Sequence, residues 1–288
     1  MNTARTTLCC LLLGTLLVFA GDFGHAEPTL LGEPCAPHAA ALPVATASPQ
    51  AKQQPTIVFQ FNTIQALLDG QYDADFTCGE LRQRGNFGIG TFNALNGEML
   101  VLNGQVWRVP GSGIPERVAD HERTPFATVM NFRANHTHEL RGIQSIEQFR
   151  KKIDELLPNR QDMFALSLRG DFAYVKTRSV PKQTAPYRRL VDIVPTQPTF
   201  ERHNVRGMLI GFWFPASLEG VNVSGLHLHF LSDDHRFGGH LLECRFDRAS
   251  LEICQGDELL IRPAPPHDTK HDAGNRQQLR DELNKVER

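Results

Sequence analysis

The chain has 288 residues, of which 41% are hydrophobic and 22% charged, a balance typical of a globular protein that buries a core. Its 30 basic and 32 acidic side chains give a formal net charge of −2. This excludes the strong basic excess with which proteins attract nucleic acid, and it gives the mature protein no charge-based reason to bind a membrane surface.

The N-terminus has the pattern of a cleaved secretory signal peptide over residues 1–26. Arg5 supplies a positive start, residues 6–20 are almost entirely apolar, and residues 24–26 provide the small side chains that a signal peptidase reads. An uncleaved membrane anchor is the alternative, but the apolar stretch is shorter than the roughly 20 residues that span a bilayer. We therefore expect the mature protein to begin at Glu27 and to be periplasmic or secreted.

Two polar segments flank the part of the chain that we expect to fold. Residues 27–55 are rich in Ala, Pro and Gln, a composition that buries too little surface to order itself, and they predict a flexible leader. Residues 263–288 start with Pro-Ala-Pro-Pro and continue as a charged tail, whose sequence is compatible with a short helix from about Asn275.

The mature chain retains four cysteines, because Cys9 and Cys10 lie in the signal peptide. An oxidising compartment permits two disulfides among them without requiring either. One arrangement pairs two of them across a hairpin and ties the leader to the folded part, but the sequence leaves all three connectivities open. The four residues are Cys35, Cys78, Cys244 and Cys254. That arrangement pairs Cys244 with Cys254 across the hairpin and Cys35 with Cys78.

Short strands dominate the first part of the expected fold. Residues 56–61 form a β-rich run, and residues 62–68 follow as a helix that Gly70 stops. The Asn103-Gly104 pair favours a type I′ turn between two further strands, which predicts an antiparallel meander. The strands of this meander cover residues 86–94, 98–102 and 105–109.

The clearest helix covers residues 145–157. Ser145 and Gln148 have the spacing of a capping box, an apolar stripe recurs at helical spacing, and Pro158 ends the helix. The strand pattern then returns over residues 163–168, 172–177, 206–214, 225–231, 239–246 and 251–254, with Gly170-Asp171 between the first two runs.

These elements predict an α+β, strand-dominated fold with mixed or antiparallel sheets and few helices. Prolines at residues 181–186 mark a weak break. It divides the fold into an N-terminal α+β half, residues 56–180, and a β-rich half, residues 181–262, that carries the candidate metal site.

The strongest chemical signal is a group of three histidines in the segment VSGLHLHFLSDDHRFGGHLLECRF. His227 and His229 point to the same face if this segment is a strand, because side chains alternate along a strand. If the chain turns at residues 232–238 and pairs back, His240 lies beside His229, and three imidazoles with open positions form a catalytic type of zinc site.

Other histidines offer weaker alternatives. His235 falls at the expected turn, where we expect it to face solvent. His136 and His138 form a second His-x-His pair, but no third ligand follows at short range. We therefore expect the metal at the first group, although histidines on a hydrophilic strand face are also compatible with no metal at all.

Two charged residues are candidates for chemistry beside a metal. Glu98 directly follows Gly97 and begins an otherwise apolar run, so it is either an exposed strand-end residue or a buried acid that serves as proton donor or metal ligand. Arg178 is one of several arginines in its region and is unremarkable by spacing alone. A guanidinium beside a metal suits a substrate carboxylate, which it can bind through two hydrogen bonds.

The stretches GIGTFNALNGEM and GLHLHFLSDDHRFGGHLLE resemble the two signature stretches of bacterial α-acetolactate decarboxylases, and the similarity runs from about residue 56 to residue 263. The resemblance implies a zinc enzyme, and a homodimer, that converts acetolactate to acetoin and carbon dioxide without an organic cofactor. Matching positions are His227, His229 and His240 for the zinc ligands, Glu98 for the active-site glutamate, Thr91 for a neighbouring substrate-binding threonine, and Arg178 for the substrate-binding arginine.

The family also places a glutamate from the C-terminal tail near the metal. The tail here offers Glu282 and Glu287 without a local motif to align them, and we favour Glu287. The long leader and the polar tail depart from the family core.

Two other classes of protein compete with this interpretation. A cupin-type metalloenzyme also carries His-x-His on a strand, but it has a glutamate shortly after the pair, where this chain has Asp233 and Asp234, and a Pro-x-Gly turn that is missing here. A non-catalytic periplasmic metal-binding or ligand-binding protein is the second alternative. The identity of the metal is open, because three imidazoles and an acid accept other first-row ions.

Overall fold

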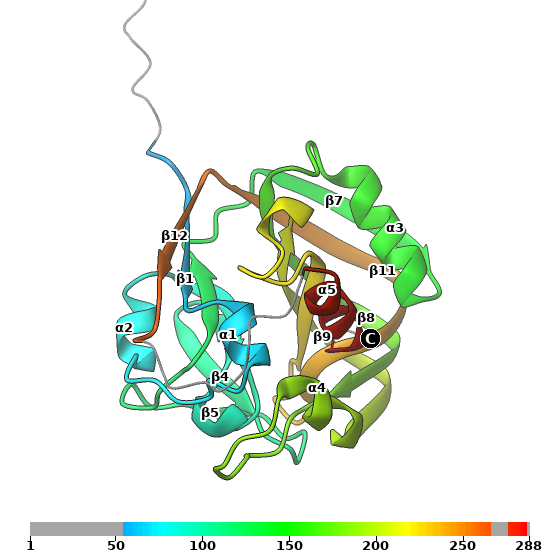
Figure 1. Cartoon of the computed structure of the whole chain (residues 1–288). Coiled ribbons are helices and arrows are strands. Elements are labelled where there is room, and N and C mark those ends of the chain that lie inside the picture. Colours follow the sequence, from blue (N-terminus) through cyan, green and yellow to red (C-terminus); the bar gives the residue numbers. More distant parts are fainter. Residues whose placement is uncertain (1–53, 266–275, 287–288) are drawn as a thin grey trace, which may run out of the picture. The chain divides into compact units, whose positions relative to one another are not determined.

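The computed structural model describes residues 54–265 and 276–286, which form two β-sheets and five α-helices (Figure 1). The predicted strand-dominated α+β fold is confirmed. The predicted signal peptide, nearly all of the predicted leader and part of the tail lie outside the described residues. None of the described helices combines the length and the apolar character needed to cross a membrane.

The first sheet has seven strands and is built around the predicted meander. Residues Asn103 and Gly104 have φ angles of 50° and 74°, as a type I′ turn requires, and they join two neighbouring strands in register. All its pairs are antiparallel except the parallel pair at one edge, β1 with β12. The order is β12 (Glu258–Arg262), β1 (Ile57–Phe61), β6 (Ala127–Met130), β2 (Phe87–Thr91), β3 (Glu98–Leu102), β4 (Gln105–Val109) and β5 (Glu116–Arg117).

The second sheet has five antiparallel strands, three of them long. Its order is β10 (Gly225–Ser232), β9 (Thr199–Phe214), β8 (Met163–Arg178), β11 (Gly238–Gly256) and β7 (His136–Ile143). An additional pairing joins β10 to the first residues of β11. The four strands β10, β9, β8 and β11 therefore close on themselves at this end of the sheet.

The helices are short and cover the sheets and the pocket described below. They are α1 (Ile64–Leu68), α2 (Cys78–Arg82), α3 (Ile146–Leu156), α4 (Leu190–Ile193) and α5 (Arg276–Val286), with 3-10 turns at Asn93–Leu95, Val194–Thr196 and Ala216–Leu218. The side chain of Ser145 caps α3 by accepting a hydrogen bond from the Gln148 amide. The second hydrogen bond of the predicted capping box differs. The side-chain oxygen of Gln148 accepts a hydrogen bond from the backbone amide of Gln144 instead of that of Ser145.

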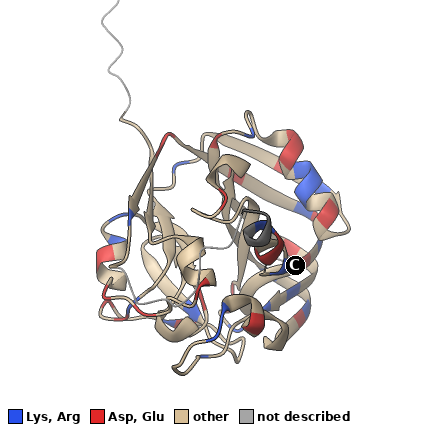
Figure 2. Cartoon of the chain, viewed as in Figure 1, with Lys and Arg blue, Asp and Glu red and all other residues tan. Residues whose placement is uncertain are grey.

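Apolar side chains bury both faces of the first sheet and join it to the second. One cluster contains residues of both sheets, among them Val58, Leu100 and Phe212, so the sheets pack against each other. A second cluster fills the space between the second sheet and α3, and a third lies between the first sheet and α2. Along α3, acidic residues lie towards both ends of the helix and basic residues lie between them (Figure 2).

The structure corrects several details of the predicted strands. β8 runs through Gly170, and β11 continues through residues 247–250 with shifts of register in place of a turn. Cys244 and Cys254 lie in this one strand, roughly 33 Å apart at about 3.3 Å per residue, so they do not face each other across a hairpin. Cys78, Cys244 and Cys254 are buried free thiols, and Cys35 lies outside the described residues.

The sheets also do not follow the suggested division at residues 181–186. β8 precedes these prolines and β9 follows them, yet the two strands pair with each other. β12, near the end of the chain, returns to the first sheet beside β1. Pairing between distant strands thus overrides the weak local break.

The aromatic core of the second sheet yields a stability prediction. Phe246 is fully buried, and its ring centroid lies 5.9 Å from that of Phe149 on α3 and 5.5 Å from that of Phe172 on β8. We expect Phe246→Ala to lower the free energy of unfolding by about 3–5 kcal/mol, because it leaves a cavity between helix and sheet. Ile114→Ala, at a side chain that is 59% exposed, should change it by less than about 0.5 kcal/mol. Equal shifts of the two variants in denaturant titrations would contradict this packing.

Candidate active site

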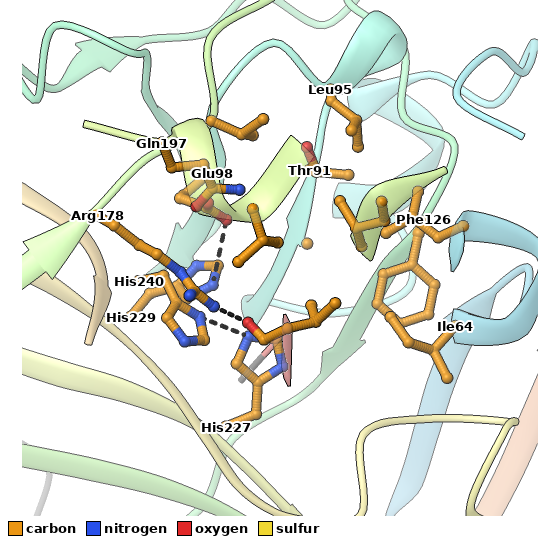
Figure 3. Close-up of a pocket in the computed structure, with 16 residues that line it drawn as sticks. Ile64, Thr91, Leu95, Glu98, Phe126, Arg178, Gln197, His227, His229 and His240 are labelled. Carbon is orange, nitrogen blue, oxygen red and sulfur yellow. Dashed lines mark hydrogen bonds and ion pairs between the residues drawn. The ribbon is translucent and has the colours of Figure 1, made fainter. Parts of the chain in front are cut away.

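Three of the predicted site residues lie in one row across neighbouring strands. His240 on β11 is directly opposite His229 on β10, and Arg178 at the end of β8 is directly opposite His240. Directly paired residues project from the same face of a sheet. His227 precedes His229 by two residues on β10 and shares that face. The predicted hairpin pairing is therefore confirmed, and the row together with His227 brings three imidazoles and one guanidinium to one place (Figure 3).

The three imidazoles have the spacing of a metal site. One ring nitrogen from each of His227, His229 and His240 lies within 4.8 Å of the others. His240 Nδ1 lies 3.2 Å from His227 Nε2. Two nitrogens bound to a tetrahedral zinc ion at about 2.0–2.1 Å are roughly 3.3 Å apart, so this pair already has that separation.

The hydrogen bonds of His229 fit a metal ligand. Its Nδ1 lies 2.9 Å from the carbonyl oxygen of Met99, and since a carbonyl only accepts, Nδ1 must carry the proton. The neutral ring then has its lone pair on Nε2, which is buried and has no hydrogen-bond partner among the described residues. A backbone carbonyl that fixes the tautomer in this way is typical of metal-binding histidines.

Burial keeps the imidazoles of this site neutral. It lowers the pKa of His227 to about 3, with a further contribution from the Arg178 guanidinium. Burial also lowers the pKa of His229 and of His240 well below the usual range, and their imidazole neighbours and Arg178 add to the effect. Neutral imidazoles keep the lone pair that a metal ion requires.

Glu98 enters the site from the first sheet. It begins β3 directly opposite Thr91, the last residue of β2, and its Oε2 lies 3.5 Å from His229 Nε2. Thr91 is buried and donates a hydrogen bond of 2.8 Å to the carbonyl of Gly97, which closes the loop between the strands. Gly97 has a φ of 92°, and a Cβ there would lie 2.4 Å from the Val109 carbonyl oxygen, so this turn requires glycine.

Arg178 is 5% exposed, and its Nη2 donates a hydrogen bond to the carbonyl of Val286 at the end of α5. The positive charge is thus held inside the pocket beside the histidines. A buried guanidinium with a fixed orientation is suited to bind a small carboxylate.

An apolar wall faces these polar groups across a cavity of about 60 Å³. The wall comes from α1, α4, α5 and nearby loops, and no sequence pattern predicted that these segments lie here. Convergent polar groups against an apolar surface are typical of small-molecule sites. The wall residues are Ile64, Leu67, Leu95, Phe126, Val180, Leu190, Val194 and Val286.

The other candidates with described positions do not line this pocket. His235 is at the turn, exposed as predicted, with its ring centroid 4.2 Å from that of Trp107. His136 and His138 lie on β7 with ring centroids 6.5 Å apart, and among residues 54–265 and 276–286 they belong to no group of three metal-type ligands. Glu282 binds Arg189, and Glu287 lies outside the described residues.

Comparison with known proteins finds one consistent family. The family model for alpha-acetolactate decarboxylase matches residues 58–273. The alpha-acetolactate decarboxylase of Brevibacillus brevis is 37% identical over 80% of this chain and 79% of its own length, and that of Bacillus subtilis is 38% identical over 73% and 83%. The chain belongs to the alpha-acetolactate decarboxylase family.

The solved structures agree with this assignment. The crystal structure of alpha-acetolactate decarboxylase from Bacillus subtilis strain 168 has a TM-score of 0.77 and 34% identity to this chain, and the match covers 80% of this chain and 99% of that one. Enzymes of this family are carboxy-lyases. Membership in the family argues against the cupin interpretation.

The geometry predicts that the three histidines hold one divalent ion. We expect His229→Ala to lose at least about nine-tenths of the bound metal, because two imidazoles remain and the Met99 carbonyl loses its donor. Elemental analysis after dialysis measures the metal content. The control His138→Ala removes an imidazole of the β7 pair and should keep the full content. The opposite result would place the metal at the other pair.

Proposed function

We propose that this protein is a zinc-dependent acetolactate decarboxylase, which converts 2-acetolactate to acetoin and carbon dioxide. One observation carries the proposal beyond family membership: a single pocket joins three neutral imidazoles, a carboxyl group and a buried guanidinium. These groups match the needs of a substrate with a carboxylate, a hydroxyl and a ketone on adjacent carbons.

The donor set suits zinc. His227, His229 and His240 would hold the ion through neutral nitrogens, and three protein ligands leave a position open, as in catalytic zinc sites. A bound zinc ion supplies a Lewis acid for the negative charge that the departure of carbon dioxide leaves on the hydroxyl and ketone oxygens.

Arg178 binds the substrate carboxylate in this mechanism. The guanidinium presents N–H groups in a plane that matches the two carboxylate oxygens. Burial and the hydrogen bond to the Val286 carbonyl fix the orientation of the guanidinium. The substrate carboxylate is therefore oriented before its bond to the neighbouring carbon breaks.

Glu98 donates the proton that completes the reaction. When the carbon–carbon bond breaks, its electron pair stays with the hydroxyl-bearing carbon and is shared with the ketone, and carbon dioxide leaves. That carbon must gain one proton to become the C–H of acetoin. The carboxyl group of Glu98 lies in the same pocket with a side chain 13% exposed, so it can donate this proton and be reprotonated by water.

The apolar wall contributes by excluding water. Its aliphatic and aromatic side chains line the same cavity as the polar groups, and we assign the methyl groups of acetolactate to this side. A wall that excludes water strengthens the electrostatic interactions of Arg178. It also leaves only the polar side of the pocket to supply proton donors.

Kinetics of two variants test these roles in the metal-loaded enzyme. Arg178→Ala should raise KM by at least about 10-fold, because it removes the group that binds and orients the carboxylate. Glu98→Gln keeps the size of the side chain but cannot donate an acidic proton, so it should lower kcat by about 100-fold with a smaller change in KM. Acetoin release from acetolactate is the measurement. A zinc-loaded wild-type protein that releases no acetoin would refute the decarboxylase proposal itself, whereas an unchanged kcat in Glu98→Gln would remove only the role of Glu98.

Export is a separate part of the proposal and rests on the sequence of residues 1–26. We expect the protein recovered from the periplasm or the medium to start at Glu27. N-terminal sequencing measures this directly. Recovery of protein that still starts at Met1 from outside the cytoplasm would contradict cleavage of the signal.

A further inference from the structure

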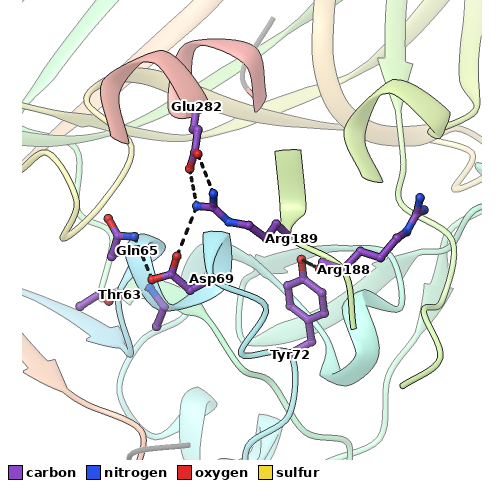
Figure 4. Close-up of polar contacts among 8 residues, drawn as sticks. Thr63, Gln65, Asp69, Tyr72, Arg188, Arg189 and Glu282 are labelled. Carbon is purple, nitrogen blue, oxygen red and sulfur yellow. Dashed lines mark hydrogen bonds and ion pairs between the residues drawn. The ribbon is translucent and has the colours of Figure 1, made fainter. Parts of the chain in front are cut away.

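The C-terminal helix α5 is tied to the pocket by a half-buried ion-pair cluster (Figure 4). Arg189, at the start of α4, makes two hydrogen bonds to Glu282 of α5: Nη1 lies 2.8 Å from Oε1 and Nη2 lies 2.7 Å from Oε2. Nη2 also lies 3.4 Å from Oδ1 of Asp69, the residue that ends α1. One guanidinium thus connects three helices that come from distant parts of the chain.

The cluster is shielded from solvent. The side chains of Arg189, Asp69 and Glu282 are 24%, 12% and 10% exposed. A two-pronged arginine–carboxylate pair at this depth is stronger than a surface pair, and removing one partner leaves a charge partly buried without its match. The second ion pair of the helix, Arg280 with Glu219, has an arginine that is 55% exposed and is expected to contribute little.

The same helix reaches the candidate active site one turn further along. Val286 follows Glu282 by four residues, its carbonyl accepts the hydrogen bond from Arg178, and its side chain lines the cavity. Leu283 and Val286 pack in the apolar cluster that also contains Leu67 and Leu190. The position of α5 therefore affects both the orientation of Arg178 and the closure of the apolar wall.

Within the part of α5 whose side chains the structure describes, few apolar contacts anchor the helix. Within its described side chains, residues 280–286, the buried apolar ones are Leu283 and Val286. A helix of 11 residues is marginal in water without tertiary contacts. The Arg189–Glu282 pair adds a strong side-chain contact that fixes the helix on α4.

We propose that Arg189 is a positioning residue for the decarboxylation: its ion pair with Glu282 docks α5 so that Val286 holds Arg178 in its substrate-binding orientation and completes the pocket. The inference rests on the proposed function in assigning Arg178 to the substrate. Arg189 itself does not line the cavity and acts through Glu282 and Val286.

The test compares Arg189→Met with Arg188→Met in the full-length mature protein. Both substitutions remove one arginine from adjacent positions, but the side chain of Arg188 is exposed and points away from the cluster (Figure 4). Its backbone carbonyl, which accepts from Tyr72, is kept in the variant. Glu282→Gln removes the charge from the other side of the pair, and Arg189→Lys keeps a positive charge but loses the two-pronged geometry.

Two measurements are made on each variant. Hydrogen exchange of residues 276–286 reports the docking of α5 without any reference to activity, and zinc content with steady-state kinetics reports the site. We expect Arg189→Met and Glu282→Gln to speed the exchange of α5 and to raise KM on the order of 10-fold at unchanged zinc content, as expected for a disturbed Arg178. Arg189→Lys should lie between these variants and the wild type, and Arg188→Met should match the wild type.

Several outcomes would overturn the inference. Unchanged exchange of α5 in Arg189→Met and Glu282→Gln would show that the pair does not dock the helix. Faster exchange with an unchanged KM would show that docking does not position Arg178. Equal changes in Arg188→Met would show a general response of this surface. A wild-type protein without decarboxylase activity would refute the proposed function, while the exchange measurement would still decide whether Arg189 docks the helix.

Discussion

The pairing of β10 with β11 is the constraint on which the candidate site depends. It closes four strands of the second sheet on themselves and sets His229 directly opposite His240. Because β11 also pairs with β8, the same register brings Arg178 opposite His240. A shift by one residue would turn these side chains to the other face of the sheet and separate the ligands. Gly211 on β9 fits this arrangement, since a Cβ there would lie 1.9 Å from the His227 carbonyl oxygen.

The electrostatics of the pocket follow from burial. Exposed imidazoles without a metal ion bind protons near neutral pH. Here burial and the neighbouring Arg178 lower the pKa of all three histidines. The sites that a metal would occupy are therefore not taken by protons. The guanidinium is the complementary element, because it keeps its charge under any physiological condition and can bind an anion beside the neutral ligands.

The sequence predicted those parts of the molecule that local rules determine. The Asn103-Gly104 turn, the helix capped by Ser145 and the hairpin that places His240 beside His229 all depend on residues within about 15 positions of one another, and the structure contains each of them. Glu98 was a candidate already as a lone acid in an apolar run, whereas the family resemblance was needed to add Thr91 and to select Arg178 among its neighbouring arginines. Predictions from the sequence were wrong where pairing between distant strands determines the structure. β8 continues through Gly170 because β9 and β11 pair with it on both sides, and β12 pairs with β1. The apolar wall and the carbonyls of Met99 and Val286 carry no sequence signal, because a backbone acceptor exists at every residue.

This difference in range divides the site into two parts. The histidines are separated by 13 residues at most, and Thr91 faces Glu98 across one short loop, so the metal-binding part is specified by two hairpins. The contacts of Arg178 with Val286 and of Arg189 with Glu282 span 108 and 93 residues. These contacts depend on where α4 and α5 pack, and not on the register of a hairpin. A change in the tail or in α4 should therefore alter how the pocket holds its substrate while the hairpins keep the metal ligands in place.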